Sequence, residues 1–596
     1  MTGIDHLEQL NRKLSTPRNR AILFILMMII YWLRIFNIDA DVIPWGVTAY
    51  QPIDEGIYSS MAINLYNLGS VDPAGYYGSG VALTNAQDIV TVVLNLVTYI
   101  GMRLFGDTYL GFRIGSIVVG LISLVLFARM VGLIFDSSET LGKYTYTAQV
   151  VGVIIYLTSF PYFNATRIVE PSLYRMLFAI ILVCCYLDRK LPWPLRSFLA
   201  GFITIFSIFF VYNTNTFFGI LVLGYLLYLI VTKRAREAKT YLLHGVVGAL
   251  SAYLFALVYY AFWGTTPLAN LITAIGIFGG STNLGYGNNY TVTLSLTMFV
   301  DAVEFISSNV ELYQIPLLAL FIILLPTFKQ MKSAEVSEPV VCLLLMVLGL
   351  FLQTLLVPDY IVRKEIIISP FLLTLLLIEL AVLLSTKMND KQRLIYLLFC
   401  LLGILFAFAV PVYRLHIAHD AVVTNADFSL KDKMILMFSC GVTIVMSIMI
   451  GMAILGAKFS YAFSAIATLF VVSIGVNVLF ITKYNVMHQT YTDRDAMVEI
   501  GEITNGKVVA GDYFYGFTLY NDALPLKNDR NALLPYFGSH EDAYFFDYAG
   551  ADSFTNDPLD MWKTLETVEE FPRSYKNRQA ADSRDVSLYR STYKDV

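Results

Sequence analysis

Long apolar runs recur along the chain and alternate with short polar segments. The first of them, residues 21–38, is followed by many runs of similar length. A helix needs about 20 apolar residues to cross the hydrocarbon core of a bilayer, which is about 30 Å thick. We expect thirteen spanning helices, near residues 21–39, 109–135, 147–163, 173–187, 197–212, 216–231, 241–262, 312–327, 340–357, 366–385, 394–412, 434–456 and 460–482.

Two apolar runs need a separate interpretation. The run at 21–38 has spanning length and no small-residue cleavage site after it, so we expect it to remain as the first helix. The run from Ile89 to Phe105 is broken by the polar residues Asp88, Asn95 and Arg103. We expect this second run to form a helix that lies along the outer membrane surface.

Basic residues favour one orientation of the chain. Short cytoplasmic segments of membrane proteins are rich in Lys and Arg. If the N-terminus is cytoplasmic, the following basic residues are cytoplasmic as well: Arg189, Lys190, Arg196, Lys233, Arg234, Arg236, Lys239, Lys329, Lys332, Lys387, Lys391, Arg393 and Lys458. Residues 40–102 and 263–312, which then lie outside, contain no Lys or Arg. An odd number of crossings makes residues 484–596 extracytoplasmic.

The composition indicates an α-helical polytopic membrane protein. Hydrophobic residues make up 57% of the chain and charged residues 14%, against about 25% charged residues in soluble proteins. Residues 484–596 hold 19 Asp and Glu against 11 Lys and Arg, so nucleic acid is not expected as a partner. The 5 cysteines all lie in apolar runs, which argues against a disulfide framework and a thiolate metal site.

Two domains are expected. Residues 1–483 would form a transmembrane domain, with a first outside loop at 40–108 that contains surface helices. Residues 484–596 would form a small extracytoplasmic α/β domain. Its expected elements are strands at Lys507–Gly511 and Asp542–Tyr548 and a helix near Pro558–Val568.

An adjacent acidic pair, Asp54 and Glu55, is the most informative polar feature. It follows soon after the first expected span. A charge close to a bilayer is costly unless it lies at an interface, in a water-filled cavity or beside a partner. A carboxylate in such a place can accept the proton of an attacking hydroxyl. The alternative is a solvated turn or a helix N-cap, for which acidic residues are also common.

More charged residues fall on the same expected outer side. Arg167 and Glu170 lie just before Pro171, and Arg363 and Lys364 follow the ninth expected span. Arg and Lys can bind the phosphate of a leaving group, so these residues and the acidic pair could converge on one outward-facing cavity. As alternatives, Glu170 could start a helix at the proline, and the basic pair could anchor at lipid headgroups.

Metal binding is an open alternative. Asp54, Glu170 and water could supply a hard oxygen site, although nothing in the spacing requires a metal. His416 and His419 are three residues apart and lie on one helical face, which is a weaker metal-like pattern. The sequence contains no Walker loop and no GxGxxG motif, so a nucleotide-driven pump or a nucleotide-sugar site is not suggested.

An ordered set of motifs resembles a known superfamily. The pattern Asp-Glu-x-x-Tyr, which ends at Tyr58, is followed by Leu104-Phe-Gly106, Phe112-Arg-Ile-Gly-Ser116 and Thr166-Arg-Ile-Val-Glu-Pro171. In this order the motifs resemble the GT-C glycosyltransferases, and within them the branch of protein O-mannosyltransferases and lipid A aminoarabinose transferases. The resemblance covers roughly residues 20–370 by motif and the whole chain by topology.

The resemblance implies a GT-C-like membrane domain and a role for each matched residue. Asp54 would be the acid at the acceptor site, with Glu55 beside it, and Glu170 would be the second acid. Arg363 and Lys364 would contact the phosphate of the lipid donor. Arg167 and Tyr58 lie in the matched motifs and would support the site.

One departure limits what the resemblance implies. Many members carry Lys-Pro-Pro or His-Pro-Pro before the surface helix, whereas this chain has Leu83-Thr-Asn-Ala-Gln-Asp88. We therefore expect transfer of a sugar from a polyprenyl-phosphate carrier. The motifs do not support aminoarabinose as that sugar.

The expected reaction is an inverting transfer with Asp54 as base, in the cytoplasmic membrane of a prokaryote. The acceptor would be an extracytoplasmic glycan, lipid or protein, and membrane lipids would surround the enzyme. The alternative function is a membrane transporter or lipid flippase, for which charges near the bilayer midplane are typical.

Overall fold

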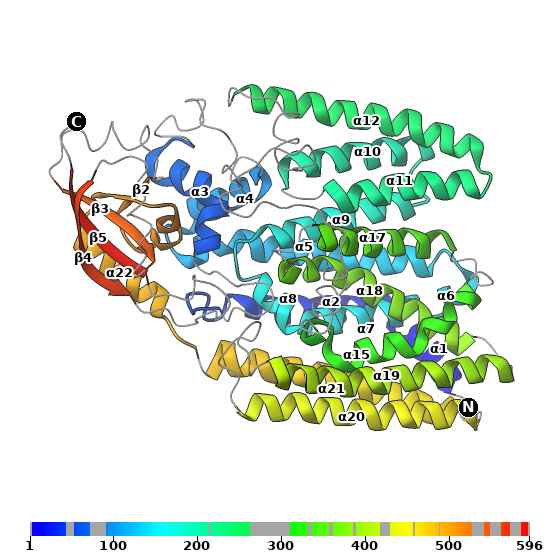
Figure 1. Cartoon of the computed structure of the whole chain (residues 1–596). Coiled ribbons are helices and arrows are strands. Elements are labelled where there is room, and N and C mark those ends of the chain that lie inside the picture. Colours follow the sequence, from blue (N-terminus) through cyan, green and yellow to red (C-terminus); the bar gives the residue numbers. More distant parts are fainter. Residues whose placement is uncertain are drawn as a thin grey trace.

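A helical bundle with a small sheet at one end is the architecture of the computed structural model (Figure 1). The structure describes residues 3–42, 53–71, 91–211, 215–262, 310–331, 337–356, 361–385, 389–417, 430–456, 459–487, 489–526, 542–548, 562–571 and 586–593. The long helices run side by side, and the sheet lies beyond the ends of the helices, opposite the N-terminus.

The helices follow the apolar runs of the sequence. Those of the bundle are α1 (Gly3–Leu14), α2 (Pro17–Trp32), α5 (Tyr109–Phe135), α7 (Thr145–Thr158), α8 (Phe160–Ala165), α9 (Pro171–Leu187), α10 (Trp193–Phe210), α11 (Asn215–Val231), α12 (Ala235–Ala261), α15 (Val310–Leu324), α17 (Ser337–Leu356), α18 (Ile361–Ser385), α19 (Asp390–Ile417), α20 (Leu430–Leu455) and α21 (Phe459–Thr482). Short helices are α6 (Glu139–Gly142), α16 (Phe328–Met331) and the turns η1 (Leu33–Ile35), η3 (Leu325–Thr327) and η5 (Lys483–Met487).

A helix occupies each segment in which the sequence predicts a span. Within the described residues, 7 helical segments are long and apolar enough to cross a membrane. They contain α5, α10, α12, α18, α19, α20 and α21. The chain is thus a multi-pass helical membrane protein by composition and length, while the number of crossings remains a prediction.

The outer helices present apolar side chains to their surroundings. On α12, Leu243, Leu250 and Val258 are exposed, and on α19 Leu398 and Phe408 are exposed. Helices satisfy their backbone hydrogen bonds internally, so such surfaces suit contact with lipid chains. Leu and Phe at these positions therefore face the place where lipid is expected.

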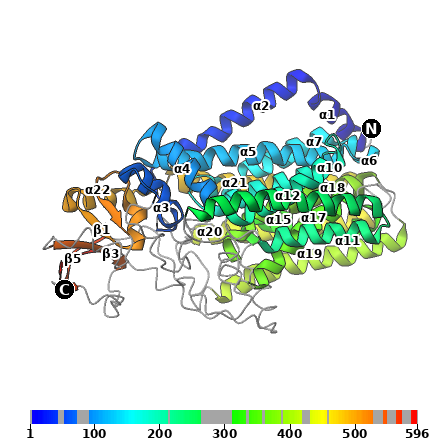
Figure 2. The same ribbon diagram turned by 90° about the horizontal axis from the view of Figure 1, so that it is seen from above.

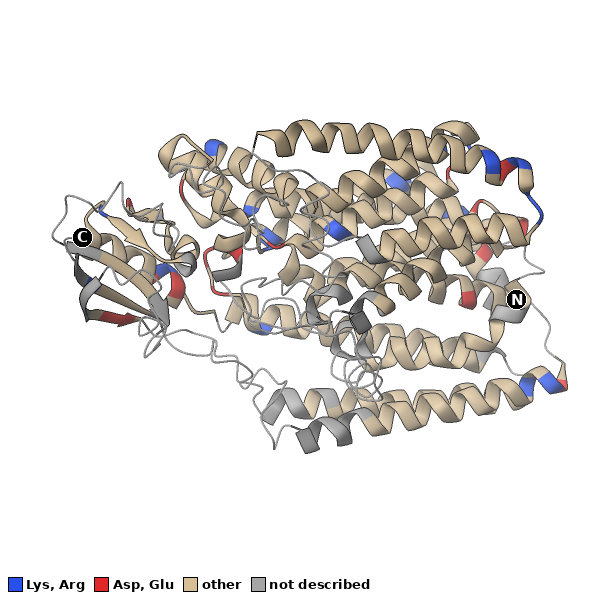
Figure 3. Ribbon diagram, turned by 45° about the horizontal axis from the view of Figure 1, so that its top comes forward, with Lys and Arg blue, Asp and Glu red and all other residues tan. Residues whose placement is uncertain are grey.

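Several charged residues lie at the ends of the bundle helices. The charged groups that begin α12 and α19 lie at the end of the bundle that holds the N-terminus (Figure 3). The acidic and basic residues of the sheet lie at the opposite end. The basic segments that begin α12 and α19 thus lie at the same end of the bundle as the N-terminus. That this end is cytoplasmic remains a prediction.

The C-terminal module consists of α22 (Thr492–Thr504), the turn η6 (Asp512–Phe517) and a sheet. The strands are β1 (Val508–Ala510), β2 (Leu524–Leu526), β3 (Asp542–Tyr548), β4 (Trp562–Phe571) and β5 (Val586–Tyr593), in the order β2-β1-β3-β5-β4. β1 pairs in parallel with β2 and β3, while β5 pairs antiparallel with β3 and β4. The two predicted strands are confirmed as β1 and β3.

The helix predicted near Pro558–Val568 is wrong, because residues 562–571 form β4. Thr564 and Thr567 of β4 lie opposite Thr592 and Tyr589 of β5. Cross-strand pairs of this kind stabilise a sheet, and β-branched residues favour it over a helix. The partner strand is remote in sequence, so the local pattern did not reveal it.

Two helices lie between the bundle and the C-terminal module: α3 (Ile53–Leu68) and α4 (Val92–Phe105) (Figures 1 and 2). The surface helix predicted at 89–105 is thus a helix, and its orientation to the bilayer remains a prediction. Asn95 does not break this helix, and its side chain is buried. Its amide accepts a hydrogen bond from Ala62 N at 2.9 Å and donates to Tyr58 O at 2.9 Å.

Candidate functional site

The acidic pair lies in the first turn of α3, which begins at Ile53. Acidic residues favour this position because the amide groups of a helix N-terminus carry partial positive charge. The side chain of Asp54 lies outside the described residues. The side chain of Glu55 is buried, with 1% of its surface exposed.

Glu55 forms a two-pronged ion pair with Arg113 of α5. Arg113 Nη2 lies 2.7 Å from Glu55 Oε2, and Nε lies 3.0 Å from Oε1. Val169 N also donates to Oε1, at 2.8 Å. Parallel Arg–carboxylate bonds are strong and fix the geometry of both groups. The Glu55 carboxylate therefore connects α3, α5 and the segment before α9.

Arg113 pairs with Glu55, and the sequence analysis named no partner for it. Its Nη1 donates to Ile38 O at 2.9 Å, and its guanidinium lies 3.9 Å from the centre of the Tyr109 ring. It belongs to a mostly apolar helix, where a charge requires a partner. That requirement was the available signal, although the spacing of 58 residues to Glu55 hid the partner itself.

Arg167 lies beside this ion pair, between α8 and α9. Its side chain is fully buried and donates to Asn485 Oδ1 and to Asn37 O. Burial, together with the positive charges of Arg113 and Arg34, lowers the pKa of Arg167 to about 9. Arg167 is still protonated at neutral pH.

Arg34 adds a further buried positive charge. Its Nε donates to Thr166 Oγ1 at 2.9 Å and its Nη2 to Leu157 O at 3.1 Å. Within the described part of the chain, neither Arg34 nor Arg167 forms an ion pair with a carboxylate. These hydrogen bonds of Arg34 and Arg167 thus run to neutral oxygen atoms.

Glu170 is the N-cap residue of α9. Its carboxylate accepts hydrogen bonds from Ser172 N at 3.0 Å and Ser172 Oγ at 2.9 Å, and Pro171 occupies the first helical turn. These are the features of the helix-start alternative. Both Glu170 and Glu55 are buried close to the segment 166–170, so the structure brings these two acids and Arg167 to one region.

The structure describes the side chains of only some of the other predicted site residues. Arg363 and Lys364 lie in the first turn of α18, and their side chains are outside the described residues, as is that of His416 at the end of α19. His419 is itself outside the described residues. Tyr58 is buried in α3. Among the residues that the structure describes, no cluster of three His, Cys, Asp or Glu side chains could hold a metal.

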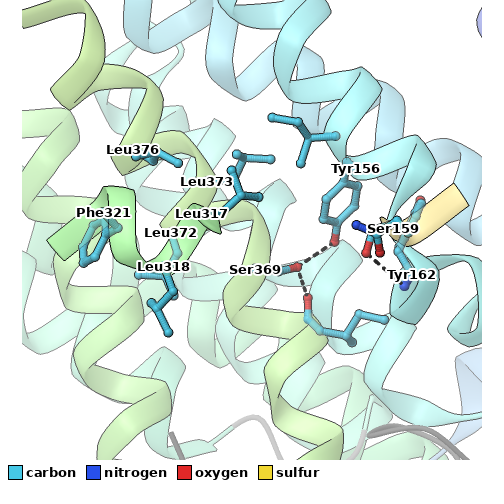
Figure 4. Close-up of a pocket in the computed structure, with 13 residues that line it drawn as sticks. Tyr156, Ser159, Tyr162, Leu317, Leu318, Phe321, Ser369, Leu372, Leu373 and Leu376 are labelled. Atoms are coloured by element: carbon cyan, nitrogen blue, oxygen red, sulfur yellow. Dashed lines mark hydrogen bonds between the residues drawn. The ribbon is translucent and has the colours of Figure 1, made fainter. Parts of the chain in front are cut away.

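A pocket lies within the bundle, bordered by α7, α8, α15, α18 and α21 (Figure 4). Most of its wall is apolar, including Leu317, Phe321 and Leu373. At one side Ser369 Oγ donates to Tyr156 OH at 3.2 Å. None of the lining residues is charged, so this pocket suits an apolar chain rather than a phosphate.

Comparisons with known proteins gave structural likeness alone. No family model matches the chain, and no curated protein matches it. The similar solved structures include ArnT from Cupriavidus metallidurans bound to undecaprenyl phosphate, at 12% identity, and the same protein in the apo state, at 13% identity. Each likeness covers 95% of this chain and 97% of the other, with a TM-score of 0.48. The identities are too low for the likeness to assign an activity.

Proposed function

We propose that the protein is a glycosyltransferase that moves a sugar from a polyprenyl-phosphate-linked donor to an extracytoplasmic acceptor. The observation that carries this proposal is the anchored acidic turn of α3. Glu55 is fixed by Arg113 and Val169 N, and Asp54 precedes it in the same turn. The ordered motifs around these residues, which resemble GT-C glycosyltransferases, support the same activity.

The proposed reaction is a single displacement at the anomeric carbon of the sugar. Asp54 accepts the proton of the acceptor hydroxyl while the hydroxyl oxygen bonds to that carbon. The bond between this carbon and the phosphate oxygen breaks, and the lipid phosphate leaves with the electron pair. Arg363 and Lys364 bind the phosphate and stabilise its growing negative charge. The configuration of the sugar is inverted because only one displacement occurs.

The apolar pocket offers space for part of the lipid chain of the donor. Ile366 and Ser369 of α18 line the pocket, and Arg363 lies one helical turn before Ile366. A phosphate held at the beginning of α18 would thus have apolar wall within one or two turns. This arrangement matches a donor that combines an anionic phosphate with a long hydrocarbon chain.

Replacing Asp54 tests the proposal. Asp54→Asn removes the basicity but retains the size, so we expect transfer to fall by about 10² or more, with donor binding retained. The measurement is transfer of a labelled sugar from a polyprenyl-phosphate donor by equal amounts of inserted protein in vesicles. Asp390→Asn, at an exposed position in α19, is the matched control. Near-normal transfer by Asp54→Asn would remove the proposed base.

A transporter is the second candidate, because Glu379 lies buried in α18. Neither oxygen of its carboxyl group has a hydrogen-bond partner among the described residues. Acidic residues inside a span are frequent in proton relays and transporters. Substrate flux across sealed vesicles that depends on Glu379, without any sugar transfer, would favour this candidate.

A further inference from the structure

The backbone of the C-terminal module approaches α3 very closely beside the acidic pair. A Cβ atom built on Gly56 would lie 2.0 Å from Gly516 N and 2.3 Å from the carbonyl carbon of Tyr515. These are backbone atoms of η6, so they cannot move away as a flexible side chain could. Only glycine fits at position 56 while η6 keeps its place.

Other contacts hold η6 and its neighbours against the same region. Asn64 Nδ2, further along α3, donates to Tyr515 OH at 3.3 Å. Tyr109 N, at the beginning of α5, donates to Tyr520 OH at 3.0 Å, and the two tyrosine rings meet edge to face. The module therefore contacts both helices that carry the Glu55–Arg113 ion pair.

The start of α22 is attached to the segment that follows α2 and η1. The Asp41 carboxylate accepts hydrogen bonds from Thr490 Oγ1 at 2.8 Å, Thr492 N at 2.9 Å and Asp493 N at 3.2 Å. A carboxylate at a helix N-terminus satisfies amide groups that lack a partner within the helix. This attachment is independent of the contact at Gly56.

We propose that the C-terminal module positions the acidic turn of α3, with Gly56 and Gly516 as positioning residues. The inference rests on the proposed glycosyltransferase function. Glu55 fixes the turn from the side of the bundle, and the backbone contact at Gly56 fixes it from the side of the module. Asp54 lies two residues before Gly56. A methyl group added at Gly56 would push η6 and α3 apart, and this shift would change the position of Asp54 relative to a bound donor.

The size of the effect follows from the geometry that catalysis needs. A displacement of about 1 Å at a reacting group can lower a rate about 10²-fold. Donor binding depends on Arg363, Lys364 and the pocket, which lie on other helices. Loss of the contact at Gly56 should therefore lower kcat and leave donor affinity largely unchanged.

Gly56→Ala in the full-length protein is the test, with Gly441→Ala as the matched control. No atom lies within 4 Å of a Cβ built on Gly441, which is in α20. For Gly56→Ala we expect kcat to fall at least about 10-fold, with donor affinity within about twofold of wild type. Amide hydrogen exchange of residues 53–68 should be faster, because α3 loses its support. Gly441→Ala should match wild type in all three measurements.

Hydrogen exchange separates this inference from the proposed function. If no variant and no wild-type protein transfers sugar, faster exchange in Gly56→Ala still supports the positioning contact while the proposed activity fails. Wild-type kcat and exchange in Gly56→Ala would overturn the positioning role. If Gly56→Ala does not fold, Asp41→Asn loosens the module without adding volume in the interface. Faster exchange of residues 53–68 is expected there too, and unchanged exchange would overturn the inference.

Discussion

Two buried glutamates differ in whether their carboxyl groups have partners. Glu55 and Glu379 are both almost completely buried. Glu55 lies at the end of the bundle, where Arg113 and Val169 N bind its carboxylate. Glu379 lies inside α18, and both of its oxygens lack a hydrogen-bond partner in the described structure.

The difference indicates which positions in this fold can hold a buried acidic side chain with a partner. A buried ion pair is tolerated when its geometry is good and its remaining hydrogen bonds are satisfied, as at Glu55. An isolated buried carboxyl group costs far more, because no partner offsets the loss of its hydration. The paired acid is therefore found where α3, α5 and the C-terminal module meet, and the acid without a partner among the described residues lies within the bundle.

The largest effect is expected when the paired acid loses its partner. Arg113→Leu leaves Glu55 buried and unpaired, which should lower the free energy of unfolding by about 3–5 kcal/mol. Denaturation of the purified protein in detergent micelles measures this change. The double variant Glu55→Gln/Arg113→Leu should recover part of the loss, since no unpaired charge remains. Equal stability of Arg113→Leu and wild type would show that the ion pair does not hold the site together.

An intermediate effect is expected at Asp107, between α4 and α5. Its Oδ1 is buried without a hydrogen-bond partner among the described residues, and burial raises the pKa of this carboxyl to about 7. From about pH 4 to pH 7 the folded protein retains a proton that the unfolded chain releases, so stability falls as pH rises through this window and levels off above it.

Asp107→Asn should remove this pH dependence. At pH 8 we expect the variant to be more stable by about 1–2 kcal/mol, less than the whole pKa shift corresponds to because the side chain is partly exposed. Unfolding midpoints between pH 5 and pH 9 provide the measurement. A wild-type protein whose stability rises across this range would contradict the assignment.

The smallest effect is expected at the unpaired acid. Glu379→Leu replaces a buried carboxyl group that has no hydrogen-bond partner among the described residues with an apolar side chain, so the free energy of unfolding should change by less than about 1.5 kcal/mol. The same denaturation assay measures it, with Arg113→Leu as the sensitive comparison. A loss of 3 kcal/mol or more would mean that Glu379 has a charged partner and that the two acids are alike.

The sequence predicted features that depend on local pattern. A bilayer needs continuous apolar segments, so the helices α5, α12 and α18 could be located from their composition. The strand β3 could be located from its alternating and aromatic residues. The strand β4 could not, because its stability comes from pairing with β5, which the local sequence does not show.

The site was predicted in part for the same reason. Asp54, Glu55 and Glu170 could be selected because charges next to apolar runs are unusual. Their partners could not be identified, since Arg113 is 58 residues from Glu55 and Gly516 is remote from Gly56. A glycine leaves no chemical signal in a sequence when its role is to permit contact between two backbones.

The bond between Asp41 and Thr490 has a consequence for how the protein is made. These residues are 449 positions apart. The hydrogen bond to Asp41 can therefore form only after most of the chain has been synthesised. The same delay applies to Gly56 and Gly516. A nascent chain can insert its early helices into the membrane, yet the acidic turn acquires its final support only near the end of translation. Ribosomal products that stop before residue 490 would thus be membrane-embedded without this support of the acidic turn.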